Sequence, residues 1–174
     1  MENNSNISLL LYMLDDIRRV TLKGVEGLTK EQLFKEAVPG EFSIGSYIMH
    51  LGECDLGWME TLSGEKQSEE LKKRVYYNTW FDCGPEDFAP PKEPLEPDEY
   101  IKAITEAREQ LRKYITKMTD SDLDTEVIQK RKSGDKKILK KWILYHLIEH
   151  KAHTRGQMFM LMRMGGLKKK GENN

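Results

Sequence analysis

The segment from Trp142 to Gln157 reads WILYHLIEHKAHTRGQ and carries three of the four histidines of the 174-residue chain. Its apolar residues recur at the three-to-four-residue interval of an amphipathic helix. Because each helical residue advances by about 100°, His146 and His153 lie within about 40–60° of His150 around such a helix. One helix therefore offers two or three imidazoles to a common point.

The fourth histidine, His50, lies in a second helical pattern, SIGSYIMHLGECDLGW, at residues 43–58. Facing imidazoles from two helices of a bundle are one way in which proteins build a metal site. For any one histidine, a hydrogen-bonded core position is the simpler explanation. Four buried imidazoles without a shared ion would each have two ring nitrogens to satisfy, at about 1–3 kcal/mol for each one missed. We therefore predict a divalent metal site between the two helices.

The charge of the chain excludes several classes of partner. Lys and Arg number 28 and Asp and Glu number 29, so the net charge is −1 and no global field attracts nucleic acid or an anionic membrane. There is no secretory leader pattern and no apolar run of about 18 residues. We expect a cytoplasmic protein that binds neither nucleic acid nor membrane, with Cys54 and Cys83 as reduced thiols.

Capping signals divide the chain into helices. Ser43 is a good N-cap, Thr29 begins a capping box with Gln32, Pro97 suits a first helical turn, and Gly165 follows a helix end. The long helices are expected at residues 7–28, 43–64, 97–118 and 136–164. On the last of them the predicted inner seam is Leu139, Trp142, Ile143, His146, His150, His153, Gln157, Met160 and Met164.

The order of these elements predicts the fold class. Residues 118–123 resemble residues 28–33, and each segment precedes a loop and a histidine-bearing helix, so the two histidine helices occupy equivalent positions and face each other. Residues 65–96 form a connection long enough to cross the bundle and to cover a pocket. The prediction is an all-α, antiparallel four-helix bundle with one long crossover connection. We expect a single domain at 1–166 and a flexible C-terminal tail at 167–174.

These residues resemble a known family. The resemblance rests on Ser43-Ile-Gly45, His50, Glu53, Trp58, the run His146 to Gln157, and Leu161-Met-Arg163. They are similar to the DinB-like proteins, whose superfamily also includes bacillithiol S-transferases and mycothiol-dependent maleylpyruvate isomerases. The resemblance implies a four-helix bundle, often dimeric, with a divalent metal, commonly nickel or zinc, held by three histidines. It matches His50 and His150 to the first two ligands.

The third ligand departs from the family pattern. Its usual position, four residues after the second ligand, is occupied here by Thr154. Either the metal is lost, or His153 or His146 supplies the third bond, or Thr154 leaves a position for water. His153 lies only about 1.5 Å from Thr154 along the helix axis, so we predict the set His50, His150 and His153.

Three further residues are candidates for the same site. Cys54, one turn beyond His50, is either a soft fourth ligand or a small buried apolar residue. Glu53 and Glu149 are candidates for fixing the tautomer of a histidine.

Two functions follow from the resemblance and from the departure at Thr154. The first is a divalent-metal enzyme, a metal-dependent thiol S-transferase or a hydrolase-like enzyme, that acts on a small molecule with a low-molecular-weight thiol as a second cofactor. The alternative is a non-catalytic four-helix-bundle dimer or small-ligand-binding protein whose metal site is degenerate at Thr154. A homodimer is expected in both.

Overall fold

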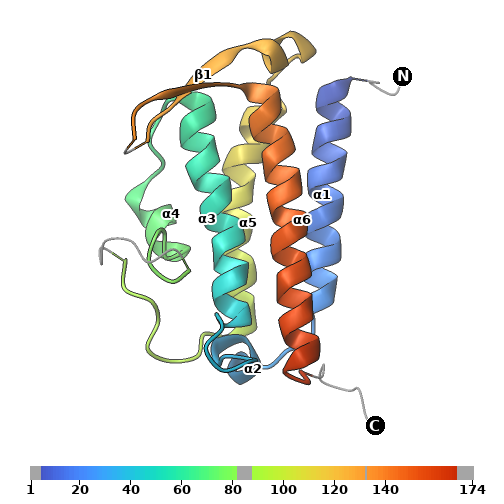
Figure 1. Cartoon of the computed structure of the whole chain (residues 1–174), viewed down its shortest axis with the longest axis vertical. Coiled ribbons are helices and arrows are strands. Elements are labelled where there is room, and N and C mark those ends of the chain that lie inside the picture. The colour runs from blue at the N-terminus through green and yellow to red at the C-terminus, as the bar shows by residue number, and fades with distance from the viewer. Residues whose placement is uncertain (1–4, 82–87, 132, 168–174) are drawn as a thin grey trace.

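The computed structural model describes residues 5–81, 88–131 and 133–167. Four long helices lie side by side in this part of the chain (Figure 1), with α6 between α1 and α3, and α5 in contact with α3 and α1. Their bounds are α1 Asn6–Val25, α3 Ile44–Ser63, α5 Pro97–Ile115 and α6 Lys140–Met164. The predicted helical fold is confirmed, with a small two-stranded sheet in addition.

The direction of each helix follows from the long crossover. Residues 64–96 return the chain to the end of the bundle at which α3 began, so α3 and α5 run parallel to each other (Figure 1). The helices α1 and α6 run in the opposite direction. As a result α3 and α6, which carry His50 and His150, are antiparallel neighbours that face each other along most of their length.

Local signals in the sequence set several helix ends as predicted, although α1 and α5 end earlier than expected, at Val25 and Ile115. The Ser43 side chain accepts a hydrogen bond from the backbone N–H of Ser46 at the start of α3, and Gly64 ends this helix in the left-handed region with φ 73°. Thr29 and Gln32 form the predicted capping box of the short helix α2, Lys30–Phe34. Thr119 forms a similar box before a 3-10 helix, η2, at Asp120–Asp124, in the corresponding place of the second half.

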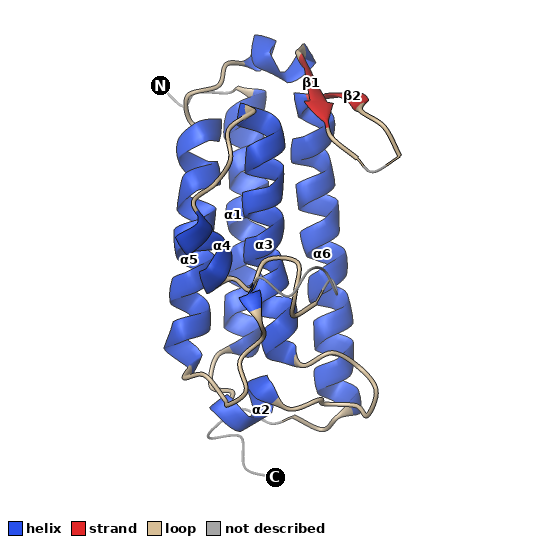
Figure 2. Ribbon diagram, turned by 90° about the vertical axis from the view of Figure 1, so that its left-hand side faces the viewer, coloured by secondary structure: helices blue, strands red, loops and turns tan. Residues whose placement is uncertain are grey.

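In its described part, the crossover contains the short helix α4, Glu69–Arg74, which contacts α5. The side chain of Val75 is buried, and the aromatic side chains that follow pack against the core beside α3. Figure 2 shows this segment lying across the outside of α3 and α5, whereas α2 closes one end of the bundle. The crossover therefore covers the flank of the helix that carries His50.

A β-hairpin replaces the predicted beginning of the last helix, and this corrects the prediction of a helix from residue 136. β1, Glu126–Gln129, pairs antiparallel with β2, Lys136–Leu139, so that Val127 lies opposite Ile138. Along β1 exposed and half-buried residues alternate, which suits a strand with one covered face, and Ile138 of β2 is buried. The hairpin projects from one end of the bundle (Figure 2), and α6 begins at Lys140.

The buried face of α6 also differs from the predicted seam. Ile143 is buried and His150 is half-buried, as the seam requires. The predicted seam residues His153, Gln157, Met160 and Met164 are exposed. The residues of α6 that are buried are Ile143, Leu144, Leu147, Lys151, Thr154, Met158, Leu161 and Met162. The prediction failed because a lysine and a threonine occupy the buried face, and polar residues are normally assigned to the solvent side.

The described core has two apolar clusters separated along the bundle axis. One cluster surrounds Ile48, Tyr100 and Met158, and the other surrounds Leu14 and Leu147. No helix in the described part of the chain is long and apolar enough to span a membrane. Leu167 still packs on the first cluster, and the rest of the expected tail, 168–174, lies outside the described residues.

Candidate metal centre

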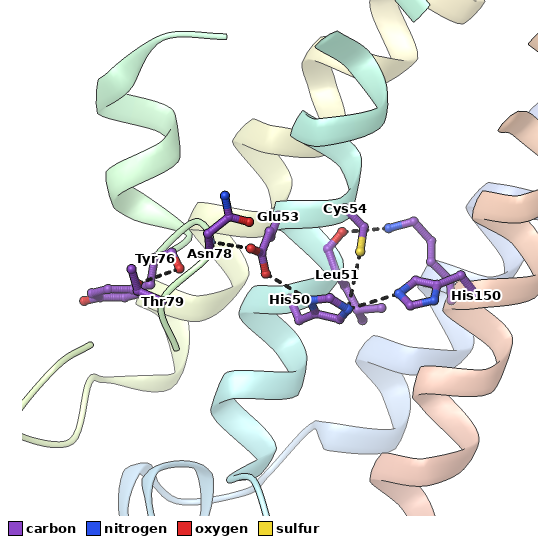
Figure 3. A network of polar contacts seen from close by, with 9 residues as sticks. His50, Leu51, Glu53, Cys54, Tyr76, Asn78, Thr79 and His150 are labelled. Carbon is purple, nitrogen blue, oxygen red and sulfur yellow. Dashed lines mark hydrogen bonds and ion pairs between the residues drawn. The ribbon is translucent and has the colours of Figure 1, made fainter. Parts of the chain in front are cut away.

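Two histidines meet between α3 and α6, as predicted. The Nε2 atoms of His50 and His150 lie 3.0 Å apart, with the ring planes inclined at 72° (Figure 3). Cys54 lies one helical turn beyond His50, which places its Sγ atom 3.5 Å from His50 Nε2. The helix period of α3 thus brings a thiol to the point at which the two imidazoles converge.

The donor atoms of His50, Cys54 and His150 all lie within 4.8 Å of one another. His50 is buried, and the other two residues are half-buried. Imidazole nitrogen and cysteine sulfur are donors that zinc and nickel accept, whereas calcium and magnesium require oxygen. These three residues therefore fit a divalent transition metal of the kind that the family resemblance implies.

Glu53 orients the imidazole of His50. Its Oε2 atom lies 2.9 Å from His50 Nδ1, and its Oε1 atom accepts a hydrogen bond from the backbone N–H of Asn78 in the crossover (Figure 3). A carboxylate at Nδ1 keeps the proton on that nitrogen, which leaves the lone pair of Nε2 directed at His150 and Cys54. Glu53 is thus placed to fix the tautomer of His50, as predicted from the sequence.

The surroundings of His50 also favour its protonated form. Burial disfavours the imidazolium, but the hydrogen bonds with Cys54 and Glu53 outweigh it and raise the pKa of His50 from 6.5 to about 10. With the proton bound, Nε2–H can donate to His150 across the 3.0 Å contact. A proton and a metal ion therefore compete for the same position.

Aromatic rings line the histidines. Phe81 stacks on His50 with ring centroids 4.2 Å apart, and Trp142 stacks on His146 at 4.8 Å. Sequence reasoning did not assign Phe81 or Asn78 to the site. The aromatic run at residues 75–81 was the available signal, but only the folded crossover shows which ring reaches His50.

The structure does not bring His153 to the two other predicted ligands. Its side chain is 74% exposed, and its Nδ1 atom lies 3.9 Å from Glu149 on the outer side of α6. Thr154, only 2% exposed, lies on the buried side instead. The physical reason is that consecutive helical residues differ by about 100° in direction, so equal height along the axis does not give the same face.

The other candidates are placed as follows. The ring of His146 lies 5.7 Å from that of His150, outside the group of donors, and its Nδ1 is 3.8 Å from Glu149. Glu149 thus lies near the Nδ1 atoms of both His146 and His153. Cys83 falls outside the described residues.

A cleft of about 260 Å³ opens beside the site. The hairpin, which the sequence did not predict, supplies one wall of this cleft. Its lining residues are His50, Glu53, Cys54, Gly57, Trp58, Thr61, Tyr77, Asn78, Gln129 and Lys130. A small molecule with polar groups could thus reach both His50 and Cys54 from solvent.

Comparison with known proteins agrees with this architecture. The sequence model of the DinB superfamily matches residues 13–158. A DinB-like protein from Bacillus cereus is 22% identical, with a TM-score of 0.65 over 94% of this chain and 95% of that chain. A conserved protein from Enterococcus faecalis is 14% identical, with a TM-score of 0.70 over 94% and 99%. At these identities the likeness shows the fold alone. No curated protein matches the chain.

Proposed function

Since the chain belongs to the DinB superfamily, we propose that it is a divalent-metal protein whose ion is held by His50, Cys54 and His150. The observation that carries the proposal is the convergence of two imidazole nitrogens and one sulfur within 4.8 Å. The donor set of two nitrogens and one sulfur favours zinc or nickel over the oxygen-preferring cations. In this proposal Cys54 supplies the third donor atom, because Thr154 stands where the family usually has its third histidine.

Each surrounding residue has a part in such a site. Glu53 holds the Nδ1 proton of His50 and so directs the Nε2 lone pair toward the ion position. Asn78 fixes Glu53 through its backbone N–H, which ties the crossover to the site. Phe81 covers one face of the His50 ring and excludes water from it. The cleft leaves His50 and Cys54 within reach of a small molecule.

We propose further that the protein is an enzyme acting on a small molecule, with a low-molecular-weight thiol as the second cofactor. A bound divalent metal would supply Lewis acidity and would lower the pKa of a thiol or a water molecule in the open position. The cleft of about 260 Å³ supports this proposal because its walls carry both polar side chains and the rings of Trp58 and Tyr77. Such a lining suits a compact substrate with an apolar part.

A second candidate is a non-catalytic bundle in which a proton occupies the position between the histidines. Two observations favour it, the raised pKa of His50 and the hydrogen-bond distance between the two Nε2 atoms. In that case His50 and His150 are a structural pair. The cleft would then serve only to bind a ligand.

Elemental analysis of untagged protein separates the two candidates. After dialysis against zinc or nickel at neutral pH, a metal protein retains one equivalent per chain, whereas the structural pair retains none. His150→Ala removes one of the three donors and should abolish retention. His153→Ala, an exposed histidine on the same helix, is the matched control and should leave retention unchanged. Retention lost only in the His153 variant would contradict the ligand set proposed here.

We also propose that the partner is a second copy of the chain. Exposed apolar side chains gather on neighbouring helices, with Leu9 and Tyr12 on α1 and Tyr145 on α6. The two helices run parallel in Figure 1, so these residues can form one surface near the same end of the bundle. A two-fold axis through that surface would bury it against itself.

A further inference from the structure

A layer of charged residues crosses the bundle between its two apolar clusters. Each of the four long helices contributes one member, namely Arg18 from α1, Asp55 from α3, Arg108 from α5 and Lys151 from α6. We call these residues the ionic layer. They line an internal cavity of about 20 Å³ together with apolar side chains such as Leu14 and Ile104. The proposed metal centre uses none of them.

Within the ionic layer, the carboxylate of Asp55 forms an ion pair with Lys151. Lys151 Nζ lies 3.0 Å from Asp55 Oδ1 and donates a hydrogen bond to the backbone oxygen of Leu51 at 2.8 Å. Both side chains of the pair are buried. The contact is an ion pair at 3.0 Å, although its angles fall outside those of a hydrogen bond. The charge of Lys151 is thus matched by that of Asp55.

Arg108 pairs with a half-exposed carboxylate at only one of its nitrogens. It is 5% exposed, and its Nη2 atom donates to Asp15 at 3.0 Å. Its Nε and Nη1 atoms are buried and have no hydrogen-bond partner among the described residues. Leaving a buried donor unsatisfied costs about 1–3 kcal/mol, and more for a charged group. Two such donors in one guanidinium indicate that a further group belongs beside it.

The charges of the layer indicate the sign of that group. Among the described residues that line the cavity, Arg18, Arg108 and Lys151 are cations and Asp55 is the one anion. Asp15 lies outside the cavity lining, is 42% exposed and also lies 3.6 Å from Arg112, so it offsets the excess only in part. Burial lowers the pKa of Arg18, the charge of Asp55 opposes this effect, and the neighbouring Arg108 adds to it, so that the pKa is lowered overall. An uncompensated positive charge in this interior is unfavourable unless an anion accompanies it.

We propose that the cavity binds a halide ion, with chloride as the physiological occupant, held by the guanidinium groups of Arg18 and Arg108. A space of about 20 Å³ has room for about one water-sized particle, which excludes phosphate, sulfate and carboxylates. A halide accepts several N–H donors and donates none, which suits the two unmatched nitrogens of Arg108. The ion would link α1 and α5 through Arg18 and Arg108, beside the Lys151–Asp55 ion pair that joins α6 and α3.

Thermal unfolding of the metal-free protein tests the proposal. At constant ionic strength, replacing gluconate by chloride or bromide should raise Tm along a saturating curve, because an ion that binds only the folded state stabilises it by mass action. Sulfate, which is too large for the cavity, should give no saturating rise, only the steady increase of a salt that is excluded from the protein surface. A bromide-soaked crystal should show an anomalous peak beside Arg108.

Variants assign the effect to the cavity. Arg108→Met should remove the halide-dependent rise in Tm, whereas Arg112→Met, a half-exposed arginine on the same helix that also contacts Asp15, should retain it. Arg18→Met gives a second test if Arg108→Met does not fold, and it too should abolish the rise. A wild-type Tm that is the same in gluconate and bromide, with only an ordered water in the cavity, would overturn the proposal.

Discussion

His50 and His150 are separated by 100 residues in the chain, yet their Nε2 atoms lie 3.0 Å apart across the contact between α3 and α6. A distance of this size suits either a shared proton or two nitrogens bound to one ion. Glu53 holds Nδ1 of His50, so that Nε2 faces His150 in both cases. The chemistry of the protein depends on whether a proton or a metal ion occupies the position between the two nitrogens.

Cys54 should be detectable as a ligand by spectroscopy. In the cobalt- or nickel-substituted protein, a bond to Cys54 should give a sulfur-to-metal charge-transfer band. Cys54→Ser should remove this band and weaken binding by about tenfold or more, equivalent to about 1.4 kcal/mol. His153→Ala should leave the band unchanged, since that side chain lies on the outer side of α6. A band that survives in Cys54→Ser would exclude the thiol from the site.

Thr154→His should have opposite effects on affinity and stability. Position 154 lies about 40° from His150 around the helix and on its buried side, so an imidazole there can join the donors and tighten metal binding. Thr154 is 2% exposed, so the larger side chain should destabilise the metal-free protein by about 1–3 kcal/mol through overpacking. Isothermal titration with zinc and chemical denaturation measure the two effects. Unchanged affinity in a folded variant would count against a metal at this position.

The metal-free protein should lose stability in mildly alkaline solution. The pKa of His50 is raised from 6.5 to about 10 in the folded state, so its stabilising contribution is complete below about pH 6.5 and is lost as the pH rises through 10. Between these values the free energy of unfolding should fall by about 1.4 kcal/mol per pH unit. Urea denaturation from neutral pH upward measures this slope.

Glu53→Gln is the control for this pH dependence. The amide cannot stabilise the imidazolium as the carboxylate does, so the slope should shrink in the variant. The same proton should also compete with metal, so that apparent affinity rises with pH well above 6.5 in the wild-type protein. A flat stability profile in both proteins would show that His50 is already neutral at pH 7.

The chain should behave as a homodimer in solution. Light scattering should give about twice the chain mass of 20.3 kDa at micromolar concentration. Tyr145→Glu places a charge on the exposed apolar surface of α6 and should shift the protein to monomer without unfolding it, as judged by circular dichroism. Met164→Glu, exposed at the far end of the same helix, is the matched comparison. A wild-type mass near that of one chain would reject the dimer.

The sequence by itself determined the helices and the meeting of two of them. Caps such as Ser43 and Thr29 act within three or four residues, so their effect can be read without knowing the fold. The histidine spacing and the helical period predicted that His50 faces the group from His146 to His153, and the family resemblance singled out His150. The motif around His150 indicated the family that the match over 13–158 establishes. These features are local, or repeat a local pattern.

Only the tertiary structure decided which side of α6 faces inward. A seam that contains Lys151 and Thr154 does not resemble a buried face, and it became one because Asp55 on α3 pairs with the lysine. Because this side of α6 faces the core, His153 lies at the surface. The strands β1 and β2 pair between nearby segments, and this pairing takes residues 136–139 out of the helix that their own sequence predicted. Such choices depend on which groups approach through space, and a short stretch of sequence does not contain its distant partner.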